Sequence, residues 1–215
     1  MDFKLTLRQA IRVCAMSIVS VAFVFGLSAP VSADECKNRG DLDSRFCDAD
    51  GDLVADMPTD ASKWLDPDTL IFSYTPVEDP SVYENVFTEF MDYLSKATGK
   101  KVKWYGAESY AAQVEAMRSG RLHVAGISTG PTVFGVNLAG YVPIAIMGKH
   151  DGRFGYKLQL ITHKSSDITK VSDMKGRNIA HVTPSSNSGN QAPRALFKSL
   201  GVEPDKDYEV KYSGK

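Results

Sequence analysis

Short apolar runs alternate with longer amphipathic stretches along this chain, a pattern that predicts alternating strands and helices. Residues 69–74 form a nearly continuous apolar run between two prolines, as expected for a parallel strand buried on both faces. The next stretch opens with Asp79-Pro80 and carries apolar side chains every three or four residues until Gly99. Proline at the first helical position and glycine after the last turn are typical of helix ends. The two stretches therefore predict a strand, a loop and one helix.

The same alternation continues to the end of the chain. It predicts strands over residues 101–105, 122–127, 141–147, 156–162, 178–182 and 208–212, helices over 109–119, 131–138 and 191–200, and a short helical turn over 171–177. Repeated strand and helix units predict an α/β fold with a largely parallel sheet. A turn rich in glycine and charge lies at 148–155. We expect the chain to cross there from a first α/β lobe to a second.

A polar turn over residues 183–190, here called the serine turn, lies between a predicted strand and a predicted helix. Its hydroxyl and amide side chains surround a helix N-terminus, where the first backbone N–H groups have no partner within the helix and the helix dipole is positive. A small oxyanion would fit there. The structural alternative is that Ser186 or Asn187 only caps the helix. One residue is enough for capping, so three polar residues followed by Gly189 favour an anion site.

Ligands of open α/β sheets bind at the carboxyl ends of the strands, where loops lead into helices. Three predicted loops have this position, at residues 75–79, 128–131 and 183–190. The first two belong to the first lobe and the third to the second lobe, so a ligand between them would be held from both sides. We expect Thr75, Ser128 and Thr129 to contribute donors from the first lobe.

The first 33 residues predict an export signal. Three basic residues precede an apolar run over 13–27, and residues 31–33 offer small side chains for cleavage; the basic residues are Lys4, Arg8 and Arg12. An uncleaved membrane anchor is the alternative. Cleavage lowers the basic count from 25 to 22 and the acidic count from 26 to 25, which gives a mature net charge of −3. The export signal leads us to expect a periplasmic protein. The sequence has no basic patch, so we expect no binding to nucleic acid.

Export leaves two cysteines, Cys36 and Cys47, in a segment with little apolar content. In an oxidising compartment such a pair is expected to form a disulfide, and two free thiols are the alternative. We predict a signal peptide over 1–33, a disulfide-stapled acidic extension over 34–68, a first α/β lobe over 69–154 and a partial second lobe over 155–215. The last region stops at a strand entering a turn, so we expect the sequence to be a fragment.

Four stretches of the sequence, in their order and spacing, are similar to the phosphonate/phosphite/phosphate family of periplasmic solute-binding proteins that serve ABC transporters. They are residues 74–80, 110–120, 171–180 and 186–189. The resemblance implies a type II periplasmic-binding-protein fold of two α/β lobes, with the second lobe incomplete here. It implies a non-enzymatic receptor for a phosphonate, phosphite or related phosphorus oxyanion, with ABC permease and ATPase subunits as partners. A receptor for another oxyanion, such as a sulfonate, is the alternative.

The resemblance also implies which residues form the site. Tyr110 and Tyr156 would face the cleft, and Ser186, Asn187 and Ser188 would donate hydrogen bonds to the phosphonate oxygens. A tyrosine taken alone is more commonly a half-buried core ring. The family often has threonine where Asn187 stands. It also has a histidine soon after the last predicted strand and acidic residues further on, and this sequence ends before them.

A serine hydrolase is the main alternative from another class. Residues 126–130 match the G-x-S-x-G nucleophile motif around Ser128, between a predicted strand and a predicted helix. His150, His163 and His181 follow in the order that a triad needs. However, His163 and His181 lie at or within strand ends, and no upstream H-G-G-G motif for an oxyanion hole is present. We therefore favour Ser128 and Thr129 as donors at a helix N-terminus.

Alternating aspartates over residues 48–56 raise the question of calcium binding. The EF-hand register fails, because placing Gly51 at loop position six puts Phe46 at position one and Met57 at position twelve. A calcium turn of another type and a solvated acidic loop stay open, and the solvated loop is favoured. The histidines have no metal-ligand spacing and no complete phosphate-binding loop motif occurs, so we expect no metal and no cofactor.

Overall fold

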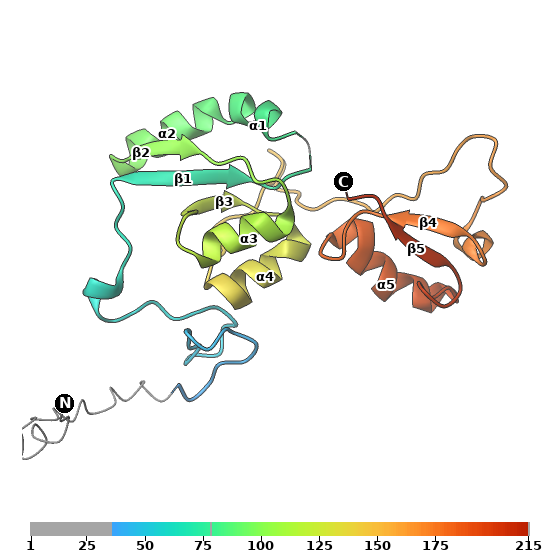
Figure 1. Cartoon of the computed structure of the whole chain (residues 1–215), viewed down its shortest axis with the longest axis horizontal. Coiled ribbons are helices and arrows are strands. Elements are labelled where there is room, and N and C mark those ends of the chain that lie inside the picture. Colours follow the sequence, from blue (N-terminus) through green and yellow to red (C-terminus); the bar gives the residue numbers. More distant parts are fainter. Residues whose placement is uncertain (1–35, 78, 215) are drawn as a thin grey trace, which may run out of the picture. The chain divides into compact units, whose positions relative to one another are not determined.

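The computed structural model describes residues 36–77 and 79–214, so the predicted signal peptide lies outside the described residues. The described chain contains two separate parallel sheets (Figure 1). The first has the order β2-β1-β3, from strands β1 (Thr69–Tyr74), β2 (Lys101–Trp104) and β3 (Val124–Gly126). The second pairs β4 (Asn178–His181) with β5 (Glu209–Tyr212). Parallel strands connected through helices confirm the predicted α/β class.

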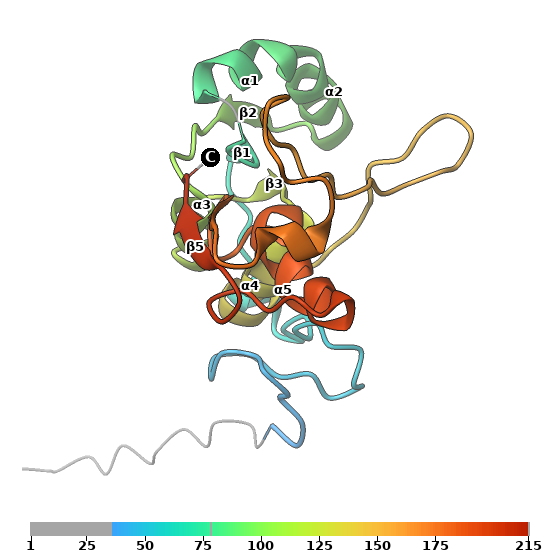
Figure 2. The same ribbon diagram turned by 90° about the vertical axis from the view of Figure 1, so that its right-hand side faces the viewer.

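Helices cover both faces of the first sheet. They are α1 (Pro80–Val86) and α2 (Thr88–Thr98) on one face, and α3 (Tyr110–Arg118) and α4 (Thr129–Ala139) on the other (Figures 1 and 2). Successive side chains of β1 point to opposite faces. Phe72 packs against Phe90 of α2, and Ile71 packs against the buried cluster around Met117 of α3. No helix in the described chain is long and apolar enough to cross a membrane.

The helix predicted over residues 79–99 is interrupted at Phe87, so that prediction is wrong in one respect. Phe87 lies between α1 and α2 with φ −95° and ψ 7°, outside the usual helical values. Its ring packs against Phe72, Tyr74 and Trp104, with ring centroids 5.4, 4.6 and 6.3 Å away. The start and the end of the predicted helix are confirmed. The interruption coincides with this aromatic contact to the sheet, which helical periodicity does not reveal.

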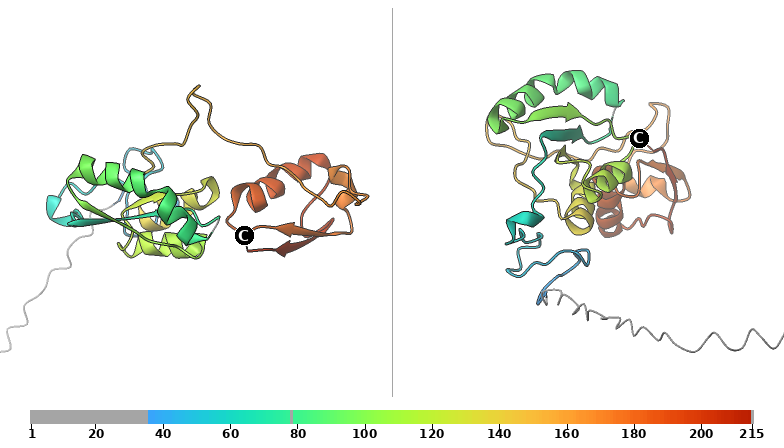
Figure 3. Two further views of the ribbon diagram at one scale, coloured as in Figure 1. Left: turned by 90° about the horizontal axis from the view of Figure 1, so that it is seen from above. Right: turned by 60° about the vertical axis from the view of Figure 1, so that its left-hand side comes forward.

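A second apolar core accompanies the β4–β5 sheet. Met174, Phe197, Val202 and Tyr208 are buried there together. The helical segment beside the sheet consists of a π-helical turn (Asn187–Gln191), α5 (Ala192–Leu196) and a 3-10 turn (Phe197–Leu200) (Figure 3). The helix predicted over 191–200 therefore begins within the serine turn, because the polar residues themselves adopt helical backbone. Another 3-10 turn (Val171–Met174) confirms the predicted helical turn, and a third lies at Ala61–Lys63.

The strands predicted over residues 141–147 and 156–162 are not formed, so both predictions are wrong. Neither segment pairs with a strand among the described residues, although an isolated antiparallel bridge joins Gly148 to Phe154. Ile144 and Ile161 are 88% and 92% exposed. A strand is stabilised by hydrogen bonds to a neighbouring strand and by burial of its apolar face. In the described chain these segments have no partner strand, and although Tyr141 and Leu158 pack against the two cores, most of the other side chains are exposed.

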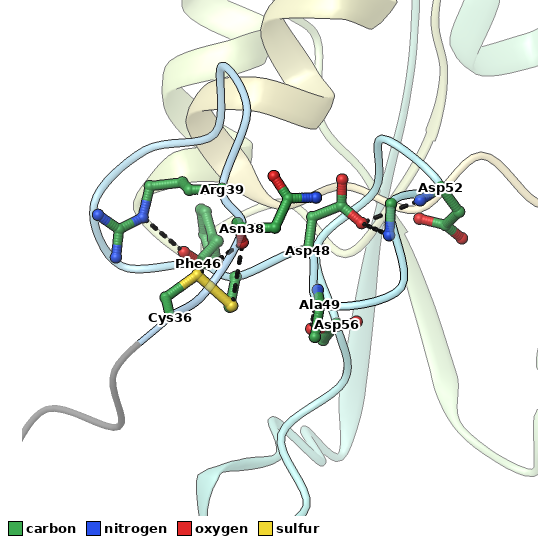
Figure 4. The surroundings of a disulfide bond; sticks show 10 residues. Cys36, Asn38, Arg39, Phe46, Asp48, Ala49, Asp52 and Asp56 are labelled. Atoms are coloured by element: carbon green, nitrogen blue, oxygen red, sulfur yellow. Dashed lines mark hydrogen bonds between the residues drawn. A yellow bond between two sulfur atoms is a disulfide. The ribbon is translucent and has the colours of Figure 1, made fainter.

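The predicted disulfide between Cys36 and Cys47 is confirmed (Figure 4). The loop that it closes contacts the carboxyl ends of α3 and α4. The Arg45 guanidinium donates to the Leu138 carbonyl at 2.7 Å and to the Arg118 carbonyl at 3.4 Å. A cation at a helix C-terminus complements the helix dipole. The extension therefore contacts and stabilises the C-terminal ends of α3 and α4.

The acidic turn over residues 48–56 is organised by its own carboxylates (Figure 4). Asp48 is buried and accepts hydrogen bonds from the backbone N–H groups of Gly51, Asp52 and Leu53, at 2.8 to 3.1 Å. Oxygen atoms of Asp48, Asp50 and Asp52 lie within 4.8 Å of one another. The hydrogen bonds explain the shape of the turn, and a calcium turn of a non-EF-hand type stays an open hypothesis.

Candidate functional site

Two adjacent parallel strands of the first sheet end at a pair of hydroxyl side chains. Thr75 follows β1, Ser128 follows β3 by two residues, and their Oγ atoms are hydrogen-bonded at 2.7 Å. Ser128 occupies the N-cap position of α4, and Thr129 is the exposed first residue of that helix. The unpaired backbone N–H groups at the start of α4 therefore lie next to two hydroxyls at the carboxyl edge of the sheet. Such an arrangement favours an anion.

Tyr110 begins the neighbouring helix α3 and is 9% exposed. Ser109 caps this helix by accepting a hydrogen bond from the Ala112 N–H at 3.1 Å. Tyr110 lines a pocket of about 400 Å³ together with residues of α4, including Pro131, and with Ser185. An aromatic ring in a pocket wall is suited to an apolar contact with a ligand.

The serine turn forms the N-terminus of the helical segment beside β4 and β5. Ser186 is buried and occupies the N-cap position, where its Oγ accepts a hydrogen bond from the Gly189 N–H at 3.2 Å. Asn187 and Ser188 follow as half-buried residues of the π-helical turn. Capping is thus an observed role of Ser186. A hydroxyl that accepts one hydrogen bond still has its own hydrogen to donate, so capping is compatible with anion binding.

The start of α4 and the serine turn come into direct contact at Gly130. A Cβ atom added there would lie 2.1 Å from the Ser185 carbonyl oxygen and 2.9 Å from the Asn187 backbone nitrogen. Real Cβ atoms essentially never come closer than 3.0 Å to another heavy atom of this kind. Glycine at this position therefore permits an approach that any side chain would block. It brings two helix N-termini together, each with unpaired backbone donors.

Tyr156 is at the predicted crossover but not in a strand, and it is 66% exposed. Its hydroxyl donates to Ser188 Oγ at 3.2 Å. The structure therefore joins Tyr156 to the serine turn and Thr75 to Ser128. Tyr110 shares a pocket with Ser185, but that pocket is lined mainly by residues of α3 and α4 and extends to Arg118 and Leu138 at the other ends of those helices.

The side chains of the site supply neutral donors. Arg194 is the cation nearest to the serine turn in the sequence, and its guanidinium pairs with Asp205 at 2.8 Å. Hydrogen bonding to Asp205 and then to Tyr212 raises the pKa of Arg194. Its charge is thus already matched by a carboxylate, and a bound anion would be met chiefly by hydroxyl and backbone N–H groups.

Ser128 lacks the geometry of a hydrolase nucleophile. Its backbone has ordinary extended angles, φ −70° and ψ 154°, whereas a nucleophile elbow is a strained turn. Its Oγ is hydrogen-bonded to Thr75 rather than to a histidine. His150 and His163 are exposed, and His181 is buried with other partners. The structure therefore provides no triad around Ser128 in the described chain.

Close packing explains the glycines of the G-x-S-x-G motif. A Cβ atom at Gly126 would lie 2.4 Å from the Tyr74 ring, and Gly130 contacts the serine turn. Gly130 belongs to the G-x-S-x-G match, but it was not among the predicted site residues. The available signal was a glycine in the first turn of a helix, where most other residues would give a more stable helix.

A protein-family model described as an ABC transporter, phosphonate, periplasmic substrate-binding protein matches residues 72–215. This range contains all the candidate ligand-binding residues described above and both sheets, apart from the first three residues of β1. The chain belongs to this phosphonate-binding family. Members of the phosphonate-binding family are transport proteins and not enzymes, which decides against the hydrolase hypothesis. The predicted fold and family are confirmed.

Relatives of this phosphonate-binding family member are known in several bacteria. Phosphate-import protein PhnD of Mycolicibacterium smegmatis is 30% identical over 153 residues, which are 69% of this chain and 47% of that protein. A binding protein component of an ABC phosphonate transporter from Pseudomonas aeruginosa has a TM-score of 0.60 and 25% identity, covering 67% of this chain and 50% of that one. PhnD1 from Prochlorococcus marinus, solved in complex with methylphosphonate, shares the fold with a TM-score of 0.51, 21% identity and coverage of 70% and 57%. The chain spans about half the length of these relatives.

Proposed function

We propose that this protein is the substrate-binding component of an ABC importer for a phosphonate, phosphite or related phosphorus oxyanion. Membership of the phosphonate-binding family carries the proposal. Two relatives support the ligand class, because one is named as a phosphate-import protein and another was solved with methylphosphonate. The contact at Gly130 between two polar helix N-termini supports the location of the site. The ligand would lie between the start of α4 and the serine turn.

Neutral donors are sufficient for such a ligand. A hydrogen bond to a charged group contributes about 1.5–3 kcal/mol. Micromolar affinity corresponds to about 8 kcal/mol, so the site needs at least roughly three well-aligned donors. In the proposal, Ser186, Asn187 and Ser188 supply donors from the serine turn, and Ser128 and Thr129 supply donors from α4.

Selectivity against phosphate needs a different contact. A phosphonate carries carbon, and phosphite carries hydrogen, where phosphate has its fourth oxygen, and neither accepts a strong hydrogen bond. An apolar contact at that corner is therefore favoured over a polar donor, which would be left unpaired. In the proposal, the Tyr110 ring provides the contact, and Tyr156 approaches from the serine turn, where its hydroxyl already meets Ser188.

The proposal includes export and delivery. The N-terminal 33 residues would direct the protein to the periplasm and be removed, which suits a family of periplasmic proteins. The partners would be a membrane permease and an ATPase subunit, since the chain has no phosphate-binding loop motif of its own. A sulfonate is the second candidate ligand, because it presents a similar tetrahedral oxyanion to the same neutral donors.

Isothermal titration calorimetry of the mature full-length protein tests the proposal. The panel is phosphite, methylphosphonate, aminoethylphosphonate, phosphate and methanesulfonate. We expect at least one phosphorus oxyanion to bind at micromolar concentration. Asn187→Thr, which installs the residue common in the family, should retain binding, whereas Asn187→Leu should lose it. Binding of methanesulfonate alone would favour the second candidate, and failure of every phosphorus oxyanion would refute the proposal.

A further inference from the structure

A buried polar network lies directly behind the serine turn. His181 at the end of β4 and Asn190 at the end of the turn are 3% and 4% exposed. His181 Nδ1 lies 2.8 Å from Asn190 Oδ1, and His181 Nε2 lies 2.8 Å from the Tyr208 hydroxyl. Asn190 Nδ2 donates to the Pro184 carbonyl at 2.8 Å. The last bond spans the serine turn from its end to its beginning.

The donors in the network fix its direction. Arg194 Nε, which can only donate, lies 2.9 Å from Asn190 Oδ1, so the oxygen of the amide faces Arg194 and His181. His181 Nδ1 must therefore carry the hydrogen that it shares with Asn190. In a neutral imidazole Nε2 is then the acceptor, and the Tyr208 hydroxyl donates to it. The chain of donation runs from Tyr208 through His181 and Asn190 to Pro184.

Tyr208 is suited to its place as the first donor in this series of hydrogen bonds. Burial raises the pKa of Tyr208 to about 12, so its hydroxyl keeps its hydrogen at physiological pH. The Tyr212 hydroxyl also donates to Asn190 Oδ1, at 3.3 Å. Asn190 Oδ1 thus accepts hydrogen bonds from His181, Arg194 and Tyr212. Asn190 Nδ2 donates in turn to the Pro184 carbonyl in the serine turn. Fully satisfied buried networks of this kind rigidify the backbone that they contact.

We propose that His181 and Asn190 are positioning residues, which hold the serine turn in its anion-binding conformation without touching the ligand. The inference rests on the proposed function for its ligand and on the hydrogen-bond geometry for its mechanism. A preorganised turn loses less conformational entropy when the anion binds. Removing the support should therefore weaken binding while the donors of the turn stay in the sequence.

Asn190→Ala removes the bond to Pro184 and is compared with Ser199→Ala. Ser199 Oγ donates to the Leu196 carbonyl at 2.6 Å, so the control also loses one side-chain to backbone bond, at the far end of the same helical segment. In the full-length protein, Asn190→Ala should raise the dissociation constant for methylphosphonate about ten-fold, the effect of one hydrogen bond. Ser199→Ala should leave it unchanged. Unchanged affinity in a folded Asn190→Ala variant would overturn the inference.

Two substitutions of His181 separate positioning from filling of space. The amide nitrogen of an asparagine can take the place of Nδ1, whereas that of a glutamine takes the place of Nε2. His181→Asn should therefore keep the donor to Asn190 and bind methylphosphonate within about two-fold of the wild type, while His181→Gln should bind about five-fold more weakly. Equal affinities of the two variants would contradict the positioning role. This pair also decides the matter if Asn190→Ala does not fold.

Hydrogen exchange in the ligand-free protein tests the inference independently of the ligand. The hydrogen-bonded backbone amides of Ser186 and Gly189 should exchange about ten-fold faster in Asn190→Ala than in the wild type or in Ser199→Ala. If the wild type binds no phosphorus oxyanion, the proposed function fails, but faster exchange would still support the positioning role. Unchanged exchange in Asn190→Ala would refute it.

Discussion

Gly130→Ala tests the contact between α4 and the serine turn with a single methyl group. The added Cβ would lie 2.1 Å from the Ser185 carbonyl oxygen, about 0.9 Å inside the 3.0 Å limit that real Cβ atoms respect. The opposing atoms at Ser185 and Asn187 belong to the backbone, so they cannot rotate away. Overpacking of this kind costs about 1–3 kcal/mol. We therefore expect the dissociation constant for methylphosphonate to rise about 5- to 150-fold.

The same substitution should have the opposite effect on the helix itself. Alanine stabilises a helix relative to glycine by up to about 1 kcal/mol, so Gly130→Ala should not lower the stability of the helix. Gly135→Ala is the matched control in α4, because the nearest atoms to its Cβ would all belong to side chains, with Ile127 Cδ1 and Met117 Sδ both at 3.4 Å. Calorimetric titration and thermal unfolding of both variants provide the test. Equal ligand affinity of Gly130→Ala, Gly135→Ala and the wild type would refute the reasoning.

Two further predictions concern stability. Replacing both Cys36 and Cys47 by serine should lower the free energy of unfolding by roughly 3 kcal/mol, because the disulfide closes a 12-residue loop and restricts the unfolded chain. A reductant should lower the free energy of unfolding of the wild type by the same amount in urea unfolding. No effect of the reductant would contradict this prediction. Burial lowers the pKa of His123, whose Nδ1 accepts a hydrogen bond from the Ile71 N–H at 2.9 Å. His123 therefore binds a proton more readily in the unfolded protein than in the folded protein. The free energy of unfolding should fall as the pH drops below about 6.5. His123→Asn, which retains an acceptor, should lose part of this pH dependence between pH 7.5 and 5, and an unaltered melting profile would count against the explanation.

The local features of the first sheet could be predicted from the sequence. The apolar run of β1 was located correctly, because a strand buried on both faces is apolar throughout. The caps of α3 at Ser109 and of α2 at Gly99 were also predicted, since their side-chain and backbone requirements are local. The interruption at Phe87 and the unformed strands at 141–162 depend on distant partners, and a periodic pattern contains no information about whether those partners are present.

The candidate site shows the same division. The serine turn could be proposed as an anion-binding helix end because its hydroxyl and amide side chains are consecutive in the sequence. The pairing of Thr75 with Ser128 follows from adjacent parallel strands. Neither the contact at Gly130 nor the support of the turn by His181 was predictable, because each joins residues from separate elements through packing. The G-x-S-x-G match also shows that close packing can produce a motif for reasons unrelated to catalysis.

A crystal structure of the full-length protein with methylphosphonate tests the central claim most directly. The account predicts that the phosphonate oxygens accept hydrogen bonds from the serine turn, at Ser186 to Ser188, and from the start of α4 at Ser128 and Thr129. It also predicts that the methyl group faces the Tyr110 ring. A ligand bound away from both helix N-termini, or contacting only one of them, would contradict the account.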